Sequence, residues 1–307
     1  MLTRRLKVDP KAFAAVSELA RFYLTTGRRN DAEKLYNDVV SQKPDDAAAL
    51  VGLAEIAVTD REWTAAADYI ARARAAAPND PVPGLLLVNM YASRGDWKSA
   101  ISAAGELVAK FPQNIDAIDA QARVQIGAGD TTAALSTYQR AQQIAPLPPP
   151  ILSHYVGLLK TTKNFTEARS ILQTALDGDP QNRSLKAELI RVEAEISGLD
   201  AGLAKARSFA RDDPGSSLYD LVSAELYEKA GRAGDGAALL EKAVAATPSD
   251  NELVLALART YMRTGDFAKA EALLSGRLKA DPKNLDAALL LAPLHMTTGH
   301  PDDAKKL

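Results

Sequence analysis

Residues 266–274 read DFAKAEALL, and the Asp281-Pro282 pair follows at the end of the same unit. This unit is one copy of a pattern that returns every 34 residues along the chain. Prolines keep the register without an insertion or a deletion, at positions 10, 44, 78, 112, 146, 180, 214, 248 and 282. A fixed period of this size indicates supersecondary units that stack on one another.

The composition fits a folded protein and excludes several classes of function. Of the 307 residues, 47% are hydrophobic, the net charge is −2 and the pI is about 6.0. This balance lacks the basic footprint of a nucleic-acid-binding protein. Without any cysteine, disulfides and thiolate metal sites are excluded. No apolar run reaches the ~18 residues of a membrane-spanning helix, and both cytoplasm and periplasm fit the composition.

The residues of each repeat are numbered so that the proline that recurs every 34 residues occupies position 32. The full repeats are 13–46, 47–80, 81–114, 115–148, 149–182, 183–216, 217–250 and 251–284, with partial repeats at 1–12 and 285–307. Position 20 is always small, as close helix packing requires: Ala32, Ala66, Ala100, Ala134, Ala168, Gly202, Gly236, Ala270 and Ala304.

Turn and capping residues divide each repeat into two helices. Position 15 is a glycine in most repeats, which suits a left-handed turn after a helix: Gly27, Gly95, Gly129, Gly231, Gly265 and Gly299. Position 34 is usually an N-cap residue that follows the helix-breaking proline: Asp46, Asp80, Asn114, Asn182, Ser216, Asp250 and Asn284. We therefore predict helices near 13–26 and 30–43 and at each 34-residue translate of these ranges.

These columns resemble the tetratricopeptide repeat family along the whole chain. The family pattern also has an aromatic residue at position 11, which Tyr23, Tyr91, Tyr227 and Tyr261 match. The resemblance implies an all-α fold, a right-handed superhelical solenoid of stacked antiparallel helix pairs in a single array over residues 1–307. Closings such as LKADPKN, residues 278–284, also resemble the long bacterial tetratricopeptide proteins of exopolysaccharide and PEP-CTERM systems.

Repeat 6 departs from the pattern. It has Glu193 at the aromatic position, Ser197 in place of the turn glycine, and Phe209 where position 27 is usually small. Because Gly202 and Phe209 lie seven residues apart on one helix face, we expect the ring of Phe209 to fill the space near Gly202.

The residues do not indicate an enzyme. The three histidines, His154, His295 and His300, lie far apart or outside any ligand spacing, and we interpret them as surface or packing residues. We identify no catalytic, cofactor-binding or metal-binding residue, and the resemblance implies no cofactor.

The resemblance also implies a concave groove lined by the first helix of each repeat. On that helix, positions 4, 7, 8 and 11 form the core face, and positions 2, 5, 9 and 12 form the opposite face. Apolar and charged side chains gather on this opposite face in repeats 7–9, where we predict a partner-binding groove: Leu218, Leu221, Glu225, Leu255, Arg259, Met262, Leu289 and Met296. A smaller secondary groove is predicted in repeats 2–3: Val51, Glu55, Val82, Leu85 and Asn89.

The predicted function is a non-enzymatic scaffold that binds a protein or peptide in this groove. The alternatives are a structural spacer within a longer tetratricopeptide protein, or an accessory to bacterial exopolysaccharide synthesis or export. Since both ends of the sequence fall inside a second helix of a repeat, we expect an open C-terminal end that exposes Leu291 and Leu294 and causes end-to-end self-association or fraying.

Overall fold

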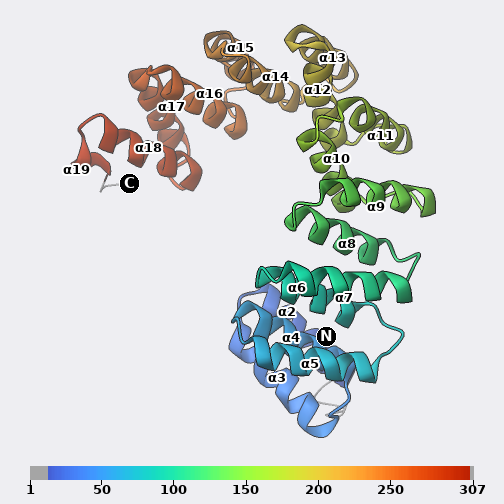
Figure 1. The fold of residues 1–307 in the computed structure, drawn as a ribbon. Coiled ribbons are helices and arrows are strands. Elements are labelled where there is room, and N and C mark those ends of the chain that lie inside the picture. The colour runs from blue at the N-terminus through green and yellow to red at the C-terminus, as the bar shows by residue number, and fades with distance from the viewer. Residues whose placement is uncertain (1–12, 305–307) are drawn as a thin grey trace. The chain divides into compact units, whose positions relative to one another are not determined.

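The computed structural model describes residues 13–304, and within this range it contains α-helices and no β-strand (Figure 1). The predicted all-α fold is therefore confirmed for the described residues. The helices of the first half of the chain are α2 (Phe13–Thr25), α3 (Arg29–Gln42), α4 (Ala47–Thr59), α5 (Trp63–Ala76), α6 (Val82–Ser93), α7 (Trp97–Lys110), α8 (Ile115–Gly127), α9 (Thr131–Ile144) and α10 (Pro149–Thr161). Those of the second half are α11 (Phe165–Gly178), α12 (Arg183–Ser197), α13 (Leu199–Asp212), α14 (Leu218–Lys229), α15 (Ala233–Ala246), α16 (Asn251–Thr264), α17 (Phe267–Ala280), α18 (Leu285–Thr297) and α19 (Pro301–Ala304).

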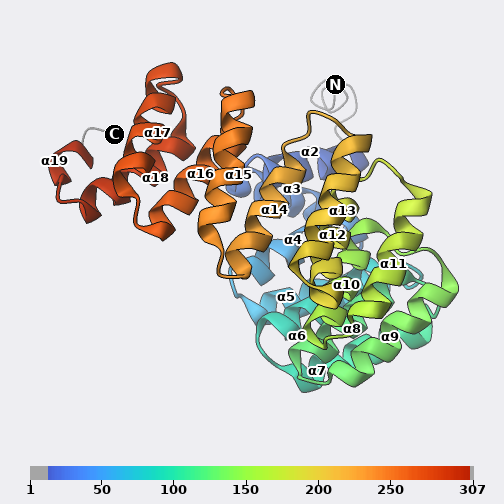
Figure 2. The same cartoon turned by 90° about the horizontal axis from the view of Figure 1, so that it is seen from above.

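The chain forms two compact units that divide between Leu158 and Leu159, inside α10. In the first unit the helix pairs α2/α3, α4/α5, α6/α7 and α8/α9 follow one another, and each pair packs on the next. In the second unit α11 packs on α12, and the pairs α12/α13, α14/α15 and α16/α17 lead to α18 and α19 (Figure 2). We call the even-numbered helices up to α18 the A helices, and the odd-numbered ones the B helices.

Side-chain caps begin most A helices at the predicted position 34. The carboxylate of Asp46 accepts a hydrogen bond from the amide of Ala49 at 3.1 Å, and Asn114 accepts one from Ala117 at 2.8 Å. Asn182, Asp250 and Asn284 cap their helices in the same way. Each cap satisfies an amide that would otherwise lack a partner in the first helical turn.

The turn between the A and B helices needs a left-handed backbone in every repeat. All six predicted glycines have a positive φ, from 71° at Gly95 to 86° at Gly129. In repeats 2 and 5 the same conformation is held by Arg61 and Lys163, with φ of 61° and 59°. Repeat 6 replaces its missing turn glycine with Gly198, one residue later, and α12 is correspondingly one residue longer than α16.

The core of the second unit extends to the last described helices. Leu291 is 2% exposed and Leu294 is 1% exposed, because both side chains pack with Ala270, Leu274 and Leu257 of α17 and α16. The expectation that Leu291 and Leu294 are exposed is therefore wrong. These two leucines face the preceding repeat, which covers them without any help from a following one.

Gly202 of α13 lies in a close contact between three helices, although the reason differs from the one expected. A Cβ at Gly202 would lie 2.7 Å from Cβ of Ala194 and 2.8 Å from Cδ1 of Leu226. The ring of Phe209 packs elsewhere, against Tyr219, with 6.3 Å between the ring centroids. The expectation that Phe209 fills the space at Gly202 is wrong: α12 and α14 fill it.

We predict that Gly202→Ala destabilises the protein by about 1–3 kcal/mol, the usual cost of an added methyl in a packed core. Alanine favours helix by only about 0.5–1 kcal/mol over glycine, which is too little to compensate. The measurement is the urea midpoint of the loss of helical circular dichroism.

Gly276→Ala is the matched control, because Gly276 also lies inside a helix of the second unit and no atom lies within 4 Å of its would-be Cβ. This variant should be stabilised. A Gly202→Ala protein that is as stable as Gly276→Ala would contradict the packing argument.

Candidate functional site

The position-9 residues of the A helices form an exposed surface, which we call the A-helix face. In the structure all of them are exposed apart from Arg191, which is half-buried: Arg21, Glu55, Asn89, Arg123, Gly157, Arg191, Glu225, Arg259 and Pro293. Glu225 and Arg259 of the predicted groove, and Glu55 and Asn89 of the predicted secondary groove, belong to this column and are exposed.

A ladder of alternating charges runs along this face in the second unit. Lys160 donates to Glu188 at 2.8 Å, Arg191 donates to Glu188 at 2.8 Å, and Arg191 also makes a bidentate pair with Glu225 at 2.8–3.0 Å. Burial alone would raise the pKa of Glu188, but the hydrogen bonds and charges of Lys160 and Arg191 outweigh burial and hold that pKa below its usual value. The ladder joins three successive A helices, and it engages the predicted groove residue Glu225 within the protein.

Arg259 is the next residue of the same column and differs in its environment. It is exposed, and it makes no ion pair with any residue between 13 and 304. Its guanidinium therefore keeps all its donors for a partner, and a carboxylate would be bound bidentately there.

Position 5, in contrast, differs in its exposure from one repeat to the next. Leu255 is 5% exposed and belongs to the same apolar cluster as Leu291 of α18. The expectation that Leu255 lies on the open face is therefore wrong, because the side chain is packed inside this cluster. Leu221 and Met262 are half-buried against the same cluster, and Leu218 is also half-buried.

The secondary groove is also only partly open. Glu55, Val82 and Asn89 are exposed, whereas Val51 and Leu85 are half-buried. Leu85 packs against the apolar cluster around α7 and α8. Nothing in the structure gathers these five side chains into one cavity.

A buried polar cluster explains why an aspartate can occupy position 5 in repeat 4. Asp119 is 6% exposed, and it accepts a hydrogen bond from the hydroxyl of Tyr138 at 2.8 Å. Nδ1 of His154, on α10, lies 2.9 Å from the same carboxylate oxygen. Burial, followed by the charge of Asp119, raises the pKa of Tyr138 above its ordinary value, so this hydroxyl stays a donor at neutral pH. His154 is thus an exposed residue whose ring contacts a buried carboxylate, within the interpretation of a surface or packing histidine.

Three exposed large hydrophobic side chains lie on α18. Leu285, Leu289 and Met296 are 68%, 62% and 62% exposed, and they are the three most exposed large hydrophobic side chains of the described residues. Positions 1, 5 and 12 of a helix fall within about 40° of one another, so the three form one stripe. We call them the α18 stripe. It includes Leu289 and Met296 of the predicted groove.

The equivalent face of α16 shows what such a surface can accept. Leu255, which lies 34 residues before Leu289, is buried where α18 packs on α16. The α18 stripe therefore has the shape and chemistry of a surface on which an apolar helix docks.

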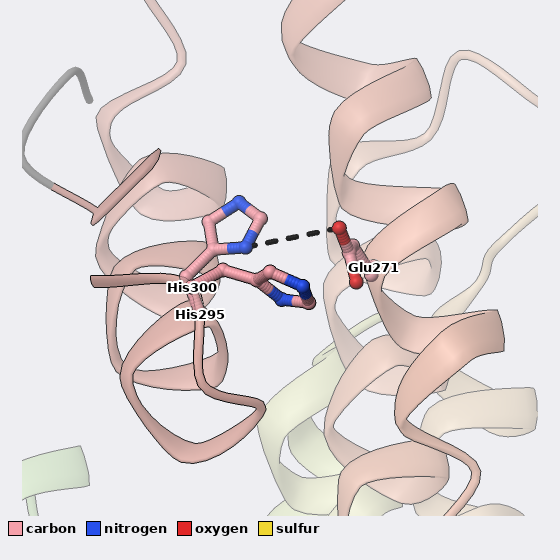
Figure 3. Close-up of side chains that lie close together, drawn as sticks. All are labelled: Glu271, His295 and His300. Atoms are coloured by element: carbon pink, nitrogen blue, oxygen red, sulfur yellow. Dashed lines mark ion pairs between the residues drawn. The ribbon is translucent and has the colours of Figure 1, made fainter. Parts of the chain in front are cut away.

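Two histidines and a glutamate lie together at the end of α18, which the sequence interpretation missed (Figure 3). One ligand atom each from Glu271, His295 and His300 lies within 4.8 Å of the other two. The two histidines are close in sequence, at the end of α18 and in the turn after it, but Glu271 lies on α17. Only the packing of α17 against α18 brings the three side chains together.

The first unit contains a small cavity between α5, α6 and α7. Its volume is about 250 Å³, and Pro78, Leu87, Leu107 and Phe111 contribute to its apolar wall. The cavity is smaller than the ~300–1,000 Å³ of most small-molecule sites.

Among the helices of residues 13–304, none is both long and apolar enough to cross a membrane.

Comparison with known proteins assigns the repeats. Two family models, both described as tetratricopeptide repeat, match residues 17–81, 125–191 and 227–281, which together make up more than half of the chain. Two solved structures share the fold. One is a tetratricopeptide repeat protein from Parabacteroides merdae, with a TM-score of 0.51 and 13% identity over 81% of this chain and 98% of that one. The other is pilF of Pseudomonas aeruginosa, with a TM-score of 0.51 and 18% identity over 70% of this chain and 98% of that one.

Two curated relatives have similar sequences. Cellulose synthase operon protein C of Xanthomonas axonopodis is 28% identical over 268 residues, which is 84% of this chain and 17% of that protein. A tetratricopeptide repeat and J domain-containing co-chaperone of Fusarium oxysporum is 26% identical over 145 residues, which is 45% of this chain and 28% of that protein. The chain thus spans less than a third of the length of either relative.

Two leucines that occupy the same repeat position should respond very differently to substitution. We predict that Leu255→Ser destabilises the protein by at least about 2–5 kcal/mol, since it removes a buried side chain and adds a hydroxyl to the core. Leu289→Ser should change the stability by no more than about 0.5 kcal/mol, the usual range for surface positions. Thermal unfolding followed by circular dichroism compares the two variants, and equal losses would contradict the burial assigned to position 5.

The charge ladder should make the second unit sensitive to acid. The folded-state pKa of Glu188 is depressed, so its contribution to stability is complete above its unfolded pKa of about 4.3 and is lost as the pH falls below that value. We therefore predict that the melting temperature falls more between pH 5 and pH 3 in the wild type than in Glu188→Gln. Glu106 is exposed, and its carboxylate lies 3.9 Å from the guanidinium of Arg74. Glu106→Gln should therefore keep the wild-type dependence of the melting temperature on pH.

Proposed function

The chain belongs to the tetratricopeptide repeat family, and we propose that it is a non-enzymatic scaffold that binds a protein or peptide segment. Proteins with these repeats generally mediate protein–protein interactions. The proposal places the partner on the second unit, with the α18 stripe as the apolar anchor and Arg259 as the charged contact.

The observation that carries the proposal is the α18 stripe itself. Three large apolar side chains on one helix face are at least 62% exposed, and contiguous exposed apolar surface commonly marks an interaction site. Since the equivalent face of α16 is covered by a helix, the partner segment is proposed to be an amphipathic helix. An acidic side chain on its rim would pair with Arg259, which has no ion-pair partner among the described residues.

The revised anchor differs from the one that sequence alone suggested. Leu255 is excluded because it is buried, and Glu225 is already engaged by Arg191. Leu218, Leu221 and Met262 remain as half-buried neighbours that could contribute their exposed edges.

We expect that helical peptides selected from a displayed library on the intact chain will carry apolar residues at i and i+4 and an acidic residue nearby. Leu289→Ser/Met296→Ser should weaken their binding at least about tenfold, the effect of losing ~1.4 kcal/mol of anchor contacts. Arg259→Glu should weaken the binding of these acidic peptides and favour peptides that carry a basic residue at the same place. Titration calorimetry measures each affinity.

Ile101→Ser is the matched control, because Ile101 is a 43% exposed apolar residue on α7 of the first unit. It should leave peptide binding unchanged. The proposed site is refuted when Leu289→Ser/Met296→Ser binds the peptides as tightly as the wild type. If substitution of Val82 or Asn89 weakens binding instead, the site lies in repeats 2–3. Concentration-dependent dimers that Leu289→Ser/Met296→Ser abolishes would instead identify a second copy of the chain as the occupant.

A role in exopolysaccharide synthesis or export is the second candidate function. The observation in its favour is the 28% identity with cellulose synthase operon protein C, which extends over 84% of this chain. Deletion of the coding region in the parent organism should then lower exopolysaccharide output, and the wild-type sequence should restore it. Unchanged output in the deletion strain would leave the alternative of a structural spacer within a longer repeat protein.

A further inference from the structure

The end of α18 brings together side chains that are suited to a metal ion. His295 is only 7% exposed, and its Nδ1 has no hydrogen-bond partner. The nearest carboxylate oxygen, Oε1 of Glu271, lies 3.7 Å away, which is too far for a hydrogen bond. A buried ring nitrogen without a partner carries a desolvation cost that is usually offset by a ligand, a water molecule or an ion.

The backbone holds the two imidazoles near each other. The amide of His300 donates to the carbonyl of His295 at 2.8 Å, and Gly299 takes a left-handed φ of 83°. This turn brings the two rings to 6.3 Å between centroids, in an edge-to-face arrangement. Glu271, on the neighbouring α17, provides the carboxylate on the same side (Figure 3).

A second hydrogen bond favours the ligand form of His300. Oγ1 of Thr298 lies 3.2 Å from Nδ1 of His300, and the same hydroxyl donates to the carbonyl of Leu294 at 3.0 Å. When that hydroxyl donates to Leu294, Oγ1 can accept a hydrogen bond from Nδ1–H of His300. In that tautomer Nε2 would be the ligand atom, as in metal-binding histidines whose second nitrogen is hydrogen-bonded.

We propose that Glu271, His295 and His300 bind a divalent transition-metal ion, with Zn²⁺ as the best match. Two neutral imidazoles and one carboxylate are a common zinc ligand set that leaves a fourth position for water or for a ligand from another molecule. Ligands of a tetrahedral zinc ion are about 3.3 Å apart, for metal–ligand distances of about 2.0 Å. The present spacing of up to 4.8 Å is wider than that value, so binding of the ion would require the three side chains to move closer together.

The bound ion would join three segments of the second unit. Glu271 lies on α17, His295 in the last turn of α18, and His300 in the turn before α19. Metal binding would thus fix the turn after α18 against α17. Mg²⁺ and Ca²⁺ prefer sets made only of oxygen ligands, so they should not compete.

The test is titration of the tag-free intact chain with Zn²⁺, followed by calorimetry and by the melting temperature. One equivalent of Zn²⁺ should bind and raise the melting temperature, whereas Mg²⁺ should do neither. His300→Ala and Glu271→Gln should each weaken Zn²⁺ binding by at least about tenfold, the scale seen even for outer-shell partners. These two positions are exposed or half-exposed, so both variants should fold, whereas replacing the buried His295 could disturb the core.

His154→Ala is the matched control, because His154 is the remaining histidine of the chain and lies in the first unit beside Asp119. It should bind Zn²⁺ like the wild type. The proposal is overturned by a wild-type chain that binds no Zn²⁺, by His300→Ala or Glu271→Gln with unchanged affinity, or by loss of binding in His154→Ala.

Discussion

The close approach of two helix backbones at position 20 is the constraint on which the rest of the structure depends. Ala32, Ala66, Ala134 and Ala270 are all completely buried at this position, and a larger side chain would separate the A and B helices of its repeat. In repeat 7 the space is smaller still: a Cβ at Gly236 would lie 3.2 Å from the carbonyl oxygen of Ala224. Since each repeat packs mainly on its neighbours, this local contact recurs and builds the whole array.

Features that belong to one repeat could be predicted from sequence, whereas the burial of a side chain by a neighbouring repeat could not. The helix bounds, the caps at Asn114 and Asn182 and the left-handed turn at Gly95 follow from residues of the same repeat. The burial of Leu255 does not, because the helix that covers it comes from the next repeat. A helical wheel assigns only one core face to an A helix, but an A helix between two neighbours is covered on a second side as well.

Charge pairs between repeats follow the same 34-residue register and so could have been found in the columns. Arg191 and Glu225 both occupy position 9 and form a bidentate pair. Glu195 and Lys229 both occupy position 13 and form a single ion pair. In these two columns the opposite charges of repeats 6 and 7 lie side by side on successive A helices. The face that sequence reading treats as free for a partner is therefore already partly used to hold neighbouring repeats together, and it is Arg259, outside this ladder, that stays available.

Two buried polar sites in this fold show how the proposed metal site differs from a packing one. Asp119 receives hydrogen bonds or close nitrogen contacts from Tyr138 and His154, so its burial is compensated by groups of the chain itself. His295 is buried to a similar degree, yet its Nδ1 has no such partner. The first arrangement is complete within the protein, and it accounts for an aspartate at a position that is leucine in four other repeats. In the second arrangement the described residues offer no hydrogen-bond partner to Nδ1 of His295. The proposed metal ion, also bound by Glu271 and His300, would be that partner.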